Sequence, residues 1–372
     1  MIILMTEEKM GEMILKRNRF GMLLIAMLLW LTAIPAYAEA DPAGEDVIEK
    51  QEVEEEPGKI PVKVLLLPKF EVGELAGDFP GEAQFYYENY LDGGEAYEIQ
   101  GTVGEGKLYV KDGVALFLLG MGKVRAGLNT MAVLKDPRFD FSDALIISTG
   151  CAGAAYEYGV MGDVFIITAA VDYDLGHQAD SRDLSDQSET TWFHDADFDE
   201  MAVVMLDKNL TDQAYEMVKD VPVETTERTR RFMEAEFDGA EWAIRDPQVL
   251  KGTTATGDNY WKGIYDHENA LLMTQTYGCP DPFALSEMED VSVATAVKNM
   301  GLLDHFLIIR DSVNMDVYMQ GATPESLWDP NYEATTLASE DSVEAADIFE
   351  TAMKNNYLVG KVVIDAALSG EL

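Results

Sequence analysis

Short apolar runs alternate with stretches of helical spacing along the chain after residue 60. Runs rich in Val, Ile and Leu predict strands that are buried on both faces; they cover residues 62–67, 114–119, 144–149, 164–168 and 305–309. Apolar residues recurring every three or four positions predict helices over residues 123–135, 282–300 and 345–354. Strands that alternate with helices predict an α/β fold built in layers.

The remaining patterns bear on domain organisation. Residues 183–249 are polar and helix-leaning, which predicts an insertion on one face of the sheet. Neither an internal repeat nor a Pro-rich or Ser-rich linker interrupts residues 60–372, so this part predicts one domain. Residues 39–59 are rich in Glu and Asp and almost lack apolar side chains, which predicts a disordered acidic tether.

The first 38 residues have the layout of a secretory signal peptide: a positive stretch, an apolar run and a small-residue cleavage pattern. These features are Lys16, Arg17 and Arg19, then residues 20–34, then Ala36-Tyr37-Ala38. The pattern predicts an exported protein, periplasmic or extracellular. An uncleaved N-terminal anchor is the alternative.

The formal net charge of -41 excludes two classes of partner. Nucleic acids and anionic membrane surfaces both require Lys and Arg patches. No apolar run of about 18 residues follows residue 38, so no membrane span is expected in the mature chain. Cys151 and Cys279 are expected to be free thiols rather than a bridge. The His and Cys spacings suggest no metal site, and no cofactor is expected.

Glycine-rich turns are expected after two of the predicted strands. Gly120-Met121-Gly122-Lys123 follows the run at 114–119, and Thr149-Gly150-Cys151-Ala152-Gly153 ends the run at 144–149. Glycine lets backbone approach a ligand closely, and ligands of open α/β sheets bind beyond the carboxyl ends of strands. Each segment alone is more often just a tight turn, and neither fits a P-loop or dinucleotide fingerprint.

Taken in order, several segments resemble those of nucleoside phosphorylases and nucleosidases. They are Leu119-Gly120-Met121-Gly122-Lys123-Val124, residues 146–153, Met161-Gly162-Asp163-Val164, Thr256-Gly257-Asp258-Asn259-Tyr260, Ser286-Glu287-Met288-Glu289 and residues 308–314. The opening at residues 63–87 resembles purine nucleoside permeases more specifically. The resemblance implies a nucleoside phosphorylase-like three-layer α/β/α fold with a central mixed sheet, spanning residues 60–372.

The resemblance also implies site residues. Glu289 would hold the ribose hydroxyls, and Asn314 would hydrogen-bond the departing base, so both are expected to be catalytic. Tyr260 would stack on the purine. The other expected substrate-binding residues are Met288, Gly122, Cys151, Gly150 and Asp258. The alternatives are a solvated carboxylate for Glu289, core packing for Tyr260 and a turn cap for Asn314.

Two departures from the family pattern concern phosphate. Phosphate-using relatives carry a Ser where this chain has Cys151, and some carry an Arg where it has Ser148. A thiol donates hydrogen bonds poorly, so water is expected as the acceptor, although Lys123 or Arg125 could supply a positive charge. An Asn at position 314 favours 6-oxopurine nucleosides such as inosine or guanosine.

The sequence therefore favours a purine nucleosidase, with a phosphorylase less favoured. The alternative is a non-catalytic purine nucleoside-binding protein that serves uptake, and a storage or scaffold protein is a third interpretation. A homo-oligomer and a separate membrane transporter both stay open as partners.

Overall fold

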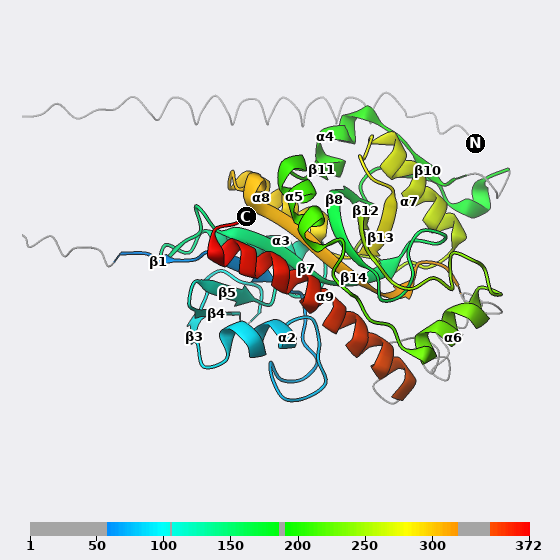
Figure 1. Cartoon of the computed structure of the whole chain (residues 1–372). Coiled ribbons are helices and arrows are strands. Elements are labelled where there is room, and N and C mark those ends of the chain that lie inside the picture. The colour runs from blue at the N-terminus through cyan, green and yellow to red at the C-terminus, as the bar shows by residue number, and fades with distance from the viewer. Residues whose placement is uncertain (1–57, 105, 186–189, 319–342) are drawn as a thin grey trace, which may run out of the picture. The chain divides into compact units, whose positions relative to one another are not determined.

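The computed structural model describes residues 58–104, 106–185, 190–318 and 343–372 (Figure 1). The chain divides into two units, Met1–Glu56 and Pro57–Leu372, and the second is the one described below. The predicted signal peptide and nearly all of the predicted tether lie outside the described residues. Among the described helices, none has the length and apolar character needed to cross a membrane.

A mixed sheet of ten strands forms the centre of the described unit, in the order β11-β8-β12-β13-β7-β2-β5-β4-β3, with β14 pairing with both β7 and β8. The strands are β2 (Val64–Leu67), β3 (Glu95–Glu98), β4 (Lys107–Lys111), β5 (Val114–Phe117), β7 (Leu145–Ala154), β8 (Val164–Asp172), β11 (Val203–Met205), β12 (Val249–Thr256), β13 (Phe283–Glu287) and β14 (Phe306–Met315). Since β14 joins β7 in parallel and β8 antiparallel, β8, β12, β13, β7 and β14 close into a ring.

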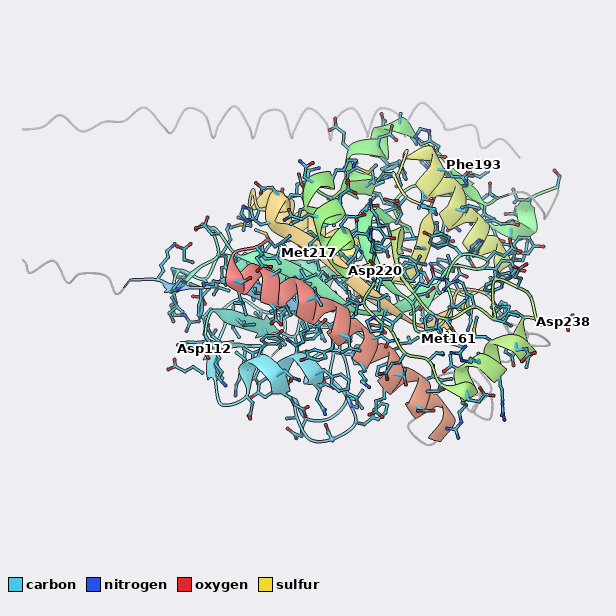
Figure 2. The ribbon with its side chains drawn as sticks, viewed as in Figure 1. Asp112, Met161, Phe193, Met217, Asp220 and Asp238 are labelled. Carbon is cyan, nitrogen blue, oxygen red and sulfur yellow. The ribbon has the colours of Figure 1, made fainter. Side chains whose placement is uncertain are left out.

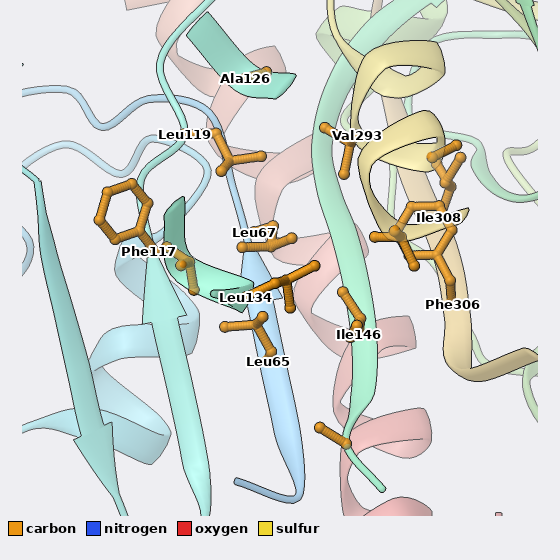
Figure 3. Packing of buried hydrophobic residues seen from close by; sticks show 14 of the residues in the cluster. Leu65, Leu67, Phe117, Leu119, Ala126, Leu134, Ile146, Val293, Phe306 and Ile308 are labelled. Carbon is orange, nitrogen blue, oxygen red and sulfur yellow. The ribbon is translucent and has the colours of Figure 1, made fainter. Parts of the chain in front are cut away.

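Helices cover both faces of this sheet. On one face α3 (Lys123–Leu134) and α8 (Asp290–Asn299) pack against Leu65 and Leu67 of β2. Figure 3 shows this layer, with Ile146 of β7 and Ile308 of β14 in the same core. On the other face, α5 (Lys208–Val218) and the long α9 (Val343–Ser369) pack in the core that holds the alternate β2 residues, Val64 and Leu66.

This alternation explains why the predicted strands are continuous apolar runs: each strand is buried on both faces. The predicted α/β fold with a central mixed sheet is thereby confirmed. A further helix, α7 (Ile264–Thr276), contributes Ala270 and Met273 to the buried core. The other described elements are β1 (Ile60–Pro61) with β6 (Phe139–Asp140), β9 (His177–Gln178) with β10 (Trp192–Phe193), α2 (Gln84–Tyr86), η1 (Tyr87–Leu91), η2 (Ser181–Asp183), η3 (Ala196–Phe198), α4 (Asp199–Ala202), α6 (Glu227–Glu236) and η4 (Leu303–His305).

The edge hairpin of the sheet has a local sequence cause. Asp112 and Gly113 connect β4 to β5 with φ values of 49° and 85°. Two consecutive left-handed residues in a two-residue loop are typical of a type I′ turn, and Asp-Gly is a favoured pair there. Asp112 accordingly lies at the outer edge of the molecule (Figure 2).

Two of the predicted elements are wrong in part. The helix expected at 282–300 is a strand, β13, followed by the shorter helix α8. Phe283 and Leu285 are buried in the sheet because β13 pairs with both β12 and β7, so tertiary pairing overrides the helical spacing. The turn expected at 149–153 is extended chain, because β7 runs on to Ala154 while paired with β14.

The predicted insertion at 183–249 contains helices α5 and α6, in keeping with its polar pattern. It also contributes strand β11 to the edge of the main sheet, which the sequence pattern did not indicate.

Candidate functional site

The predicted site residues converge where β5, β7, β13 and β14 end. β5 leads into a turn with Gly120 (φ 78°) and Gly122 (φ 89°), and α3 begins at the next residue. Both angles lie in the left-handed region, which glycine adopts readily. A Cβ at Gly122 would meet Asp258 Oδ1 at 3.2 Å, so the turn lies against the loop that follows β12. The turn thus brings backbone N–H groups into the centre of the site.

Glu289 lies at the start of α8 and is almost fully buried, at 4% exposed. Its Oε1 accepts a hydrogen bond from Gly122 N at 3.0 Å, and its Oε2 accepts one from Arg310 Nη2 at 3.1 Å. The alternative of a solvated helix carboxylate is therefore wrong. Met288, the preceding residue, is half-buried between Glu287 and Glu289.

Arg310 organises the acidic side of the site from within β14, where it is 1% exposed. Its Nε and Nη2 donate to Asp290 at 2.9 Å, and Nη2 also donates to Glu287 Oε2 at 3.1 Å. Burial raises the pKa of Glu287 to about 7. The Arg310 charge, followed by that of Lys69, outweighs burial at Asp290 and holds the pKa of that carboxyl at about 2.

Arg310 is not among the residues predicted for the site. The signal that could have found it is a guanidinium within an otherwise apolar strand, since a buried charge is kept where it is paired. Arg310 also connects these three carboxylates to β7, because its Nη1 donates to the Cys151 carbonyl oxygen at 2.8 Å.

A further buried carboxyl, Glu82, bonds to Cys151. Glu82 Oε1 accepts from Cys151 N at 2.9 Å and from Cys151 Sγ at 3.3 Å, while Oε2 accepts from Lys69 N at 2.7 Å. Gly150 has φ 147°, and a Cβ there would collide with the Glu82 carboxyl. Burial raises the pKa of Glu82, and the positive charges of Arg310 and Lys69 oppose that rise.

Glu82 is a second residue that sequence analysis missed as a candidate site residue. It follows Pro80 and Gly81 in the opening segment, far along the chain from Cys151. Nothing in the local pattern distinguishes it from Glu71 or Glu88, which bind backbone N–H groups of their own loop.

Asn314 and Tyr260 meet at the outer end of the site. Asn314 Nδ2 donates to Tyr260 Oη at 2.6 Å, and a Cβ at Gly153 would lie 3.4 Å from Asn314 Oδ1. Tyr260 is 62% exposed, so core packing does not explain it. Its hydroxyl end is more enclosed, and burial there raises the pKa of Tyr260 to about 12. Because the phenol oxygen accepts from the amide, its own O–H stays available as a donor.

The positive end of α3 is neutralised by carboxylates of this chain. Asp258 Oδ1 accepts from Lys123 N at 2.8 Å, beside the bond from Gly122 N to Glu289. The Lys123 ammonium lies 2.7 Å from Asp172 Oδ1 and 2.8 Å from Asp174 Oδ2. Gly122 N, Lys123 N and the Lys123 ammonium, three donors that could attract an anion at this helix N-terminus, are thus already bonded to carboxylates.

Ser148 lies two residues before Gly150 in β7 and is fully buried. Its Oγ accepts from Lys69 Nζ at 2.6 Å and donates to Asp290 Oδ1 at 2.8 Å. Lys69 Nζ is 3.4 Å from the same Asp290 oxygen, so this buried cation is neutralised too. Cys151 and Cys279 are both free, as predicted.

Two known proteins are similar to this chain in sequence. A probable purine nucleoside permease of Schizosaccharomyces pombe is 28% identical over 220 residues, which cover 53% of this chain and 63% of the relative. A 5′-methylthioadenosine/S-adenosylhomocysteine nucleosidase of Anoxybacillus flavithermus is 27% identical over 201 residues, which cover 54% of this chain and 67% of that protein. The match to the yeast relative therefore spans less than two thirds of its length.

Among solved structures, the 5′-methylthioadenosine/S-adenosylhomocysteine nucleosidase of Neisseria meningitidis, in complex with methylthio-immucillin-A, has a TM-score of 0.50. The similarity covers 82% of this chain and 99% of that one, at 16% sequence identity. At this identity the likeness concerns the fold, and it confirms the predicted nucleoside phosphorylase-like architecture.

The family model described as purine nucleoside permease (NUP) matches residues 61–370, which is nearly the whole of the described unit. The chain therefore belongs to the purine nucleoside permease family.

Proposed function

We propose that this protein binds purine nucleosides and cleaves their N-glycosidic bond with water as the acceptor. The observation that carries the proposal is that two buried carboxyls meet at Arg310 and Cys151: Glu289 accepts from Arg310, Glu82 accepts from Cys151, and Arg310 donates to the Cys151 carbonyl oxygen. Asn314, on the same strand as Arg310, bonds to Tyr260. The nucleosidase relative and the fold are consistent with it.

The chemistry of the reaction requires these groups. Cleavage passes through a sugar with positive charge and a base with negative charge, and an enzyme must stabilise both. Glu289 would orient the ribose hydroxyls and favour the positive sugar. The Asn314 amide and the Tyr260 hydroxyl would hydrogen-bond the departing base. Glu82, whose pKa is raised by burial, would act on the attacking water.

The choice of water over phosphate rests on the occupied donors at the start of α3. Phosphate recognition relies on charge-assisted hydrogen bonds. Here Gly122 N and Lys123 N bond to Glu289 and Asp258, and the Lys123 ammonium is held between two carboxylates. A phosphate dianion would have to displace them and approach a chain of net charge -41.

Product analysis with inosine tests the proposed reaction. We expect hypoxanthine and free ribose to form at the same rate with and without phosphate. Guanosine and adenosine should be compared in parallel, because the Asn314 amide favours 6-oxopurines. Ribose 1-phosphate that forms only when phosphate is present would show that the protein is a phosphorylase.

Substitution of the two predicted ligand contacts tests the site itself. We expect Asn314→Ala and Glu289→Ala each to weaken inosine affinity about tenfold or more, since a lost buried hydrogen bond costs about 1–3 kcal/mol. Isothermal titration calorimetry measures the effect, with Asn89→Ala on the exposed η1 as the matched control. Unchanged affinity in both site variants would exclude this site assignment.

A second function, nucleoside capture without cleavage, is favoured by the permease description and by Asn314 itself. An amide has no proton to transfer to a departing base. In this function the protein would deliver nucleoside to a separate membrane transporter, either alone or as a homo-oligomer. Inosine that binds but releases no hypoxanthine in the same assay would establish capture and exclude hydrolysis.

A further inference from the structure

Asp311 is a buried carboxyl that the proposed reaction has not yet used. It lies in β14 with 0% exposure, and neither of its carboxyl oxygens has a hydrogen-bond partner in the described part of the chain. An ionised carboxylate is strongly disfavoured in such a place. Burial raises the pKa of Asp311 well above its ordinary value, and the charge of Glu82 raises it further. The protonated form of Asp311 is therefore favoured.

Strand geometry places Asp311 beside Cys151 and Glu82. Asp311 is the ladder partner of Cys151 in the parallel pairing of β14 with β7, so their side chains lie on the same face. This face packs against α9, where Cys151 contacts the cluster of Ala352 and Met353. The N–H and the thiol of Cys151 both donate to Glu82 Oε1. Cys151 thus has one acid, Glu82, bonded to it and the other, Asp311, next to it.

The other groups around Asp311 leave it without a counter-charge of its own. On α9, Asn356 is engaged by neighbours: its Oδ1 accepts from Tyr86 Oη and from Thr149 Oγ1, each at 2.7 Å. The Asn356 amide and the Arg310 charge lower the pKa of Asp311, but burial and Glu82 outweigh them. Arg310 is committed to the Glu287, Glu289 and Asp290 carboxylates on the opposite face. The nearby Tyr86 and Cys151 both have raised pKa values, so neither supplies charge.

We propose that Glu82 and Asp311 share one proton and together carry the proton from the attacking water to the departing purine. This inference rests on the hydrolysis proposed above. Ionised Glu82 takes one proton from water as the water oxygen bonds to C1′ of the ribose. The glycosidic bond breaks, and its electron pair leaves with the purine. The two carboxyls then hold two protons, and one passes to the purine, which restores the starting state.

The pair supplies what Asn314 lacks. An amide can orient and hydrogen-bond the base, but it cannot deliver a proton. Two carboxyls that cannot both ionise stay singly protonated over a wide pH range, so an acid and a base are present together. Glu82 without Asp311 would be either a protonated acid or an ionised base at a given pH, and could not supply both forms together.

The first test replaces the proton-holding carboxyl by an amide of the same shape. We expect Asp311→Asn to leave inosine affinity within about twofold and to lower turnover about tenfold or more. It should also remove one limb of the pH–rate profile, since only Glu82 then titrates. Unchanged turnover with an unchanged pH profile would overturn the proposal.

A stability measurement separates this role from a structural one. The folded-state pKa of Asp311 lies above its unfolded value, so its contribution to stability is lost as pH rises above about 4. The Asp311→Asn variant lacks this pH-dependent loss of stability. The difference in melting temperature between the variant and the parent, in favour of the variant, should therefore be larger at pH 8 than at pH 5. Asp163→Asn is the control, because Asp163 is equally buried but bonds to Arg245 and to backbone N–H groups. That variant should melt below the parent.

The shared proton can be measured without turnover. In protein with ¹³C-labelled carboxyl groups, we expect Asp311 to stay protonated at pH 7 and to titrate at lower pH in Glu82→Gln, which removes the neighbouring charge. If Asp311 titrates near pH 4 in the parent, or if it titrates at the same pH in Glu82→Gln as in the parent, the two carboxyls do not share a proton. This conclusion does not depend on the activity of either protein. A parent that releases no hypoxanthine would exclude the proposed hydrolysis, while the titration still decides whether the proton is shared.

Discussion

Arg310→Met is expected to destabilise the protein by about 3–5 kcal/mol, the range for removing one partner of a buried ion pair. Arg310 is 1% exposed and bonds three carboxylates, from Glu287, Glu289 and Asp290. Methionine fills a similar volume but leaves those carboxylates buried without their cation. Urea unfolding at neutral pH measures the loss.

The same variant should show a characteristic pH dependence. In the parent, the pKa of Asp290 is about 2, below its unfolded value of about 3.8, so its stabilising contribution is present above that value and is lost as pH falls. Without Arg310 the buried carboxyls resist ionisation, their pKa values rise above the unfolded values, and stability falls as pH rises. The deficit relative to the parent should therefore be larger at pH 8 than at pH 5.

Arg231→Met is the matched control for Arg310→Met. Arg231 also pairs with a carboxylate, that of Glu227, but both side chains are mostly exposed, at 76% and 71%. Exposed pairs contribute about 0–1 kcal/mol, so this variant should unfold close to the parent. An Arg310→Met protein as stable as Arg231→Met would mean that the acidic side of the site holds together without its buried cation.

The fold was predictable from sequence wherever strands are apolar on both faces. β2 consists of Val and Leu alone, and β14 has only apolar residues up to Arg310. The sequence pattern located both strands. β12 was missed because Lys251, Gly252 and a run of threonines hide it. Those threonines are nevertheless buried, and their hydroxyls bond to oxygens of neighbouring segments: Thr253 to the Asp281 carbonyl and Thr254 to Glu287. Polar strands of this kind become visible only when their partners are known.

The candidate site was predictable where one segment carries its own signal. Gly122, Glu289, Tyr260 and Asn314 were found from family-like segments, and hydrogen bonds now connect them in two pairs. Glu82, Arg310 and Asp311 were missed as site residues because their environment is made by distant parts of the chain. Local sequence contains no information that α9 covers Asp311 or that Cys151 N–H faces Glu82.

Glu82→Gln is expected to lower turnover of inosine about 10²-fold or more while changing its affinity little, if the proposed hydrolysis is correct. Loss of a positioned general base or acid typically costs 10²–10⁴ in rate. Glutamine keeps an oxygen that can accept from Cys151 N or Lys69 N, the two backbone donors that hold Glu82. The backbone of β7 at Gly150 and Cys151 should therefore stay in place, and the change removes the ionisable group alone.

Glu88→Gln is the control for Glu82→Gln, because it makes the same charge change six residues further along the same segment. Glu88 accepts from Gly77 N at the surface and makes no bond to Cys151, so its variant should turn over inosine like the parent. Initial rates of hypoxanthine release, together with calorimetric inosine binding, separate the two steps. Equal rates in both variants would remove Glu82 from the reaction. A Glu82→Gln protein that neither binds nor cleaves inosine would show instead that this carboxyl is needed to hold the site together. Weak turnover with intact binding is the result that assigns the attacking water to Glu82, since nothing in the substitution alters the Glu289 or Asn314 contacts.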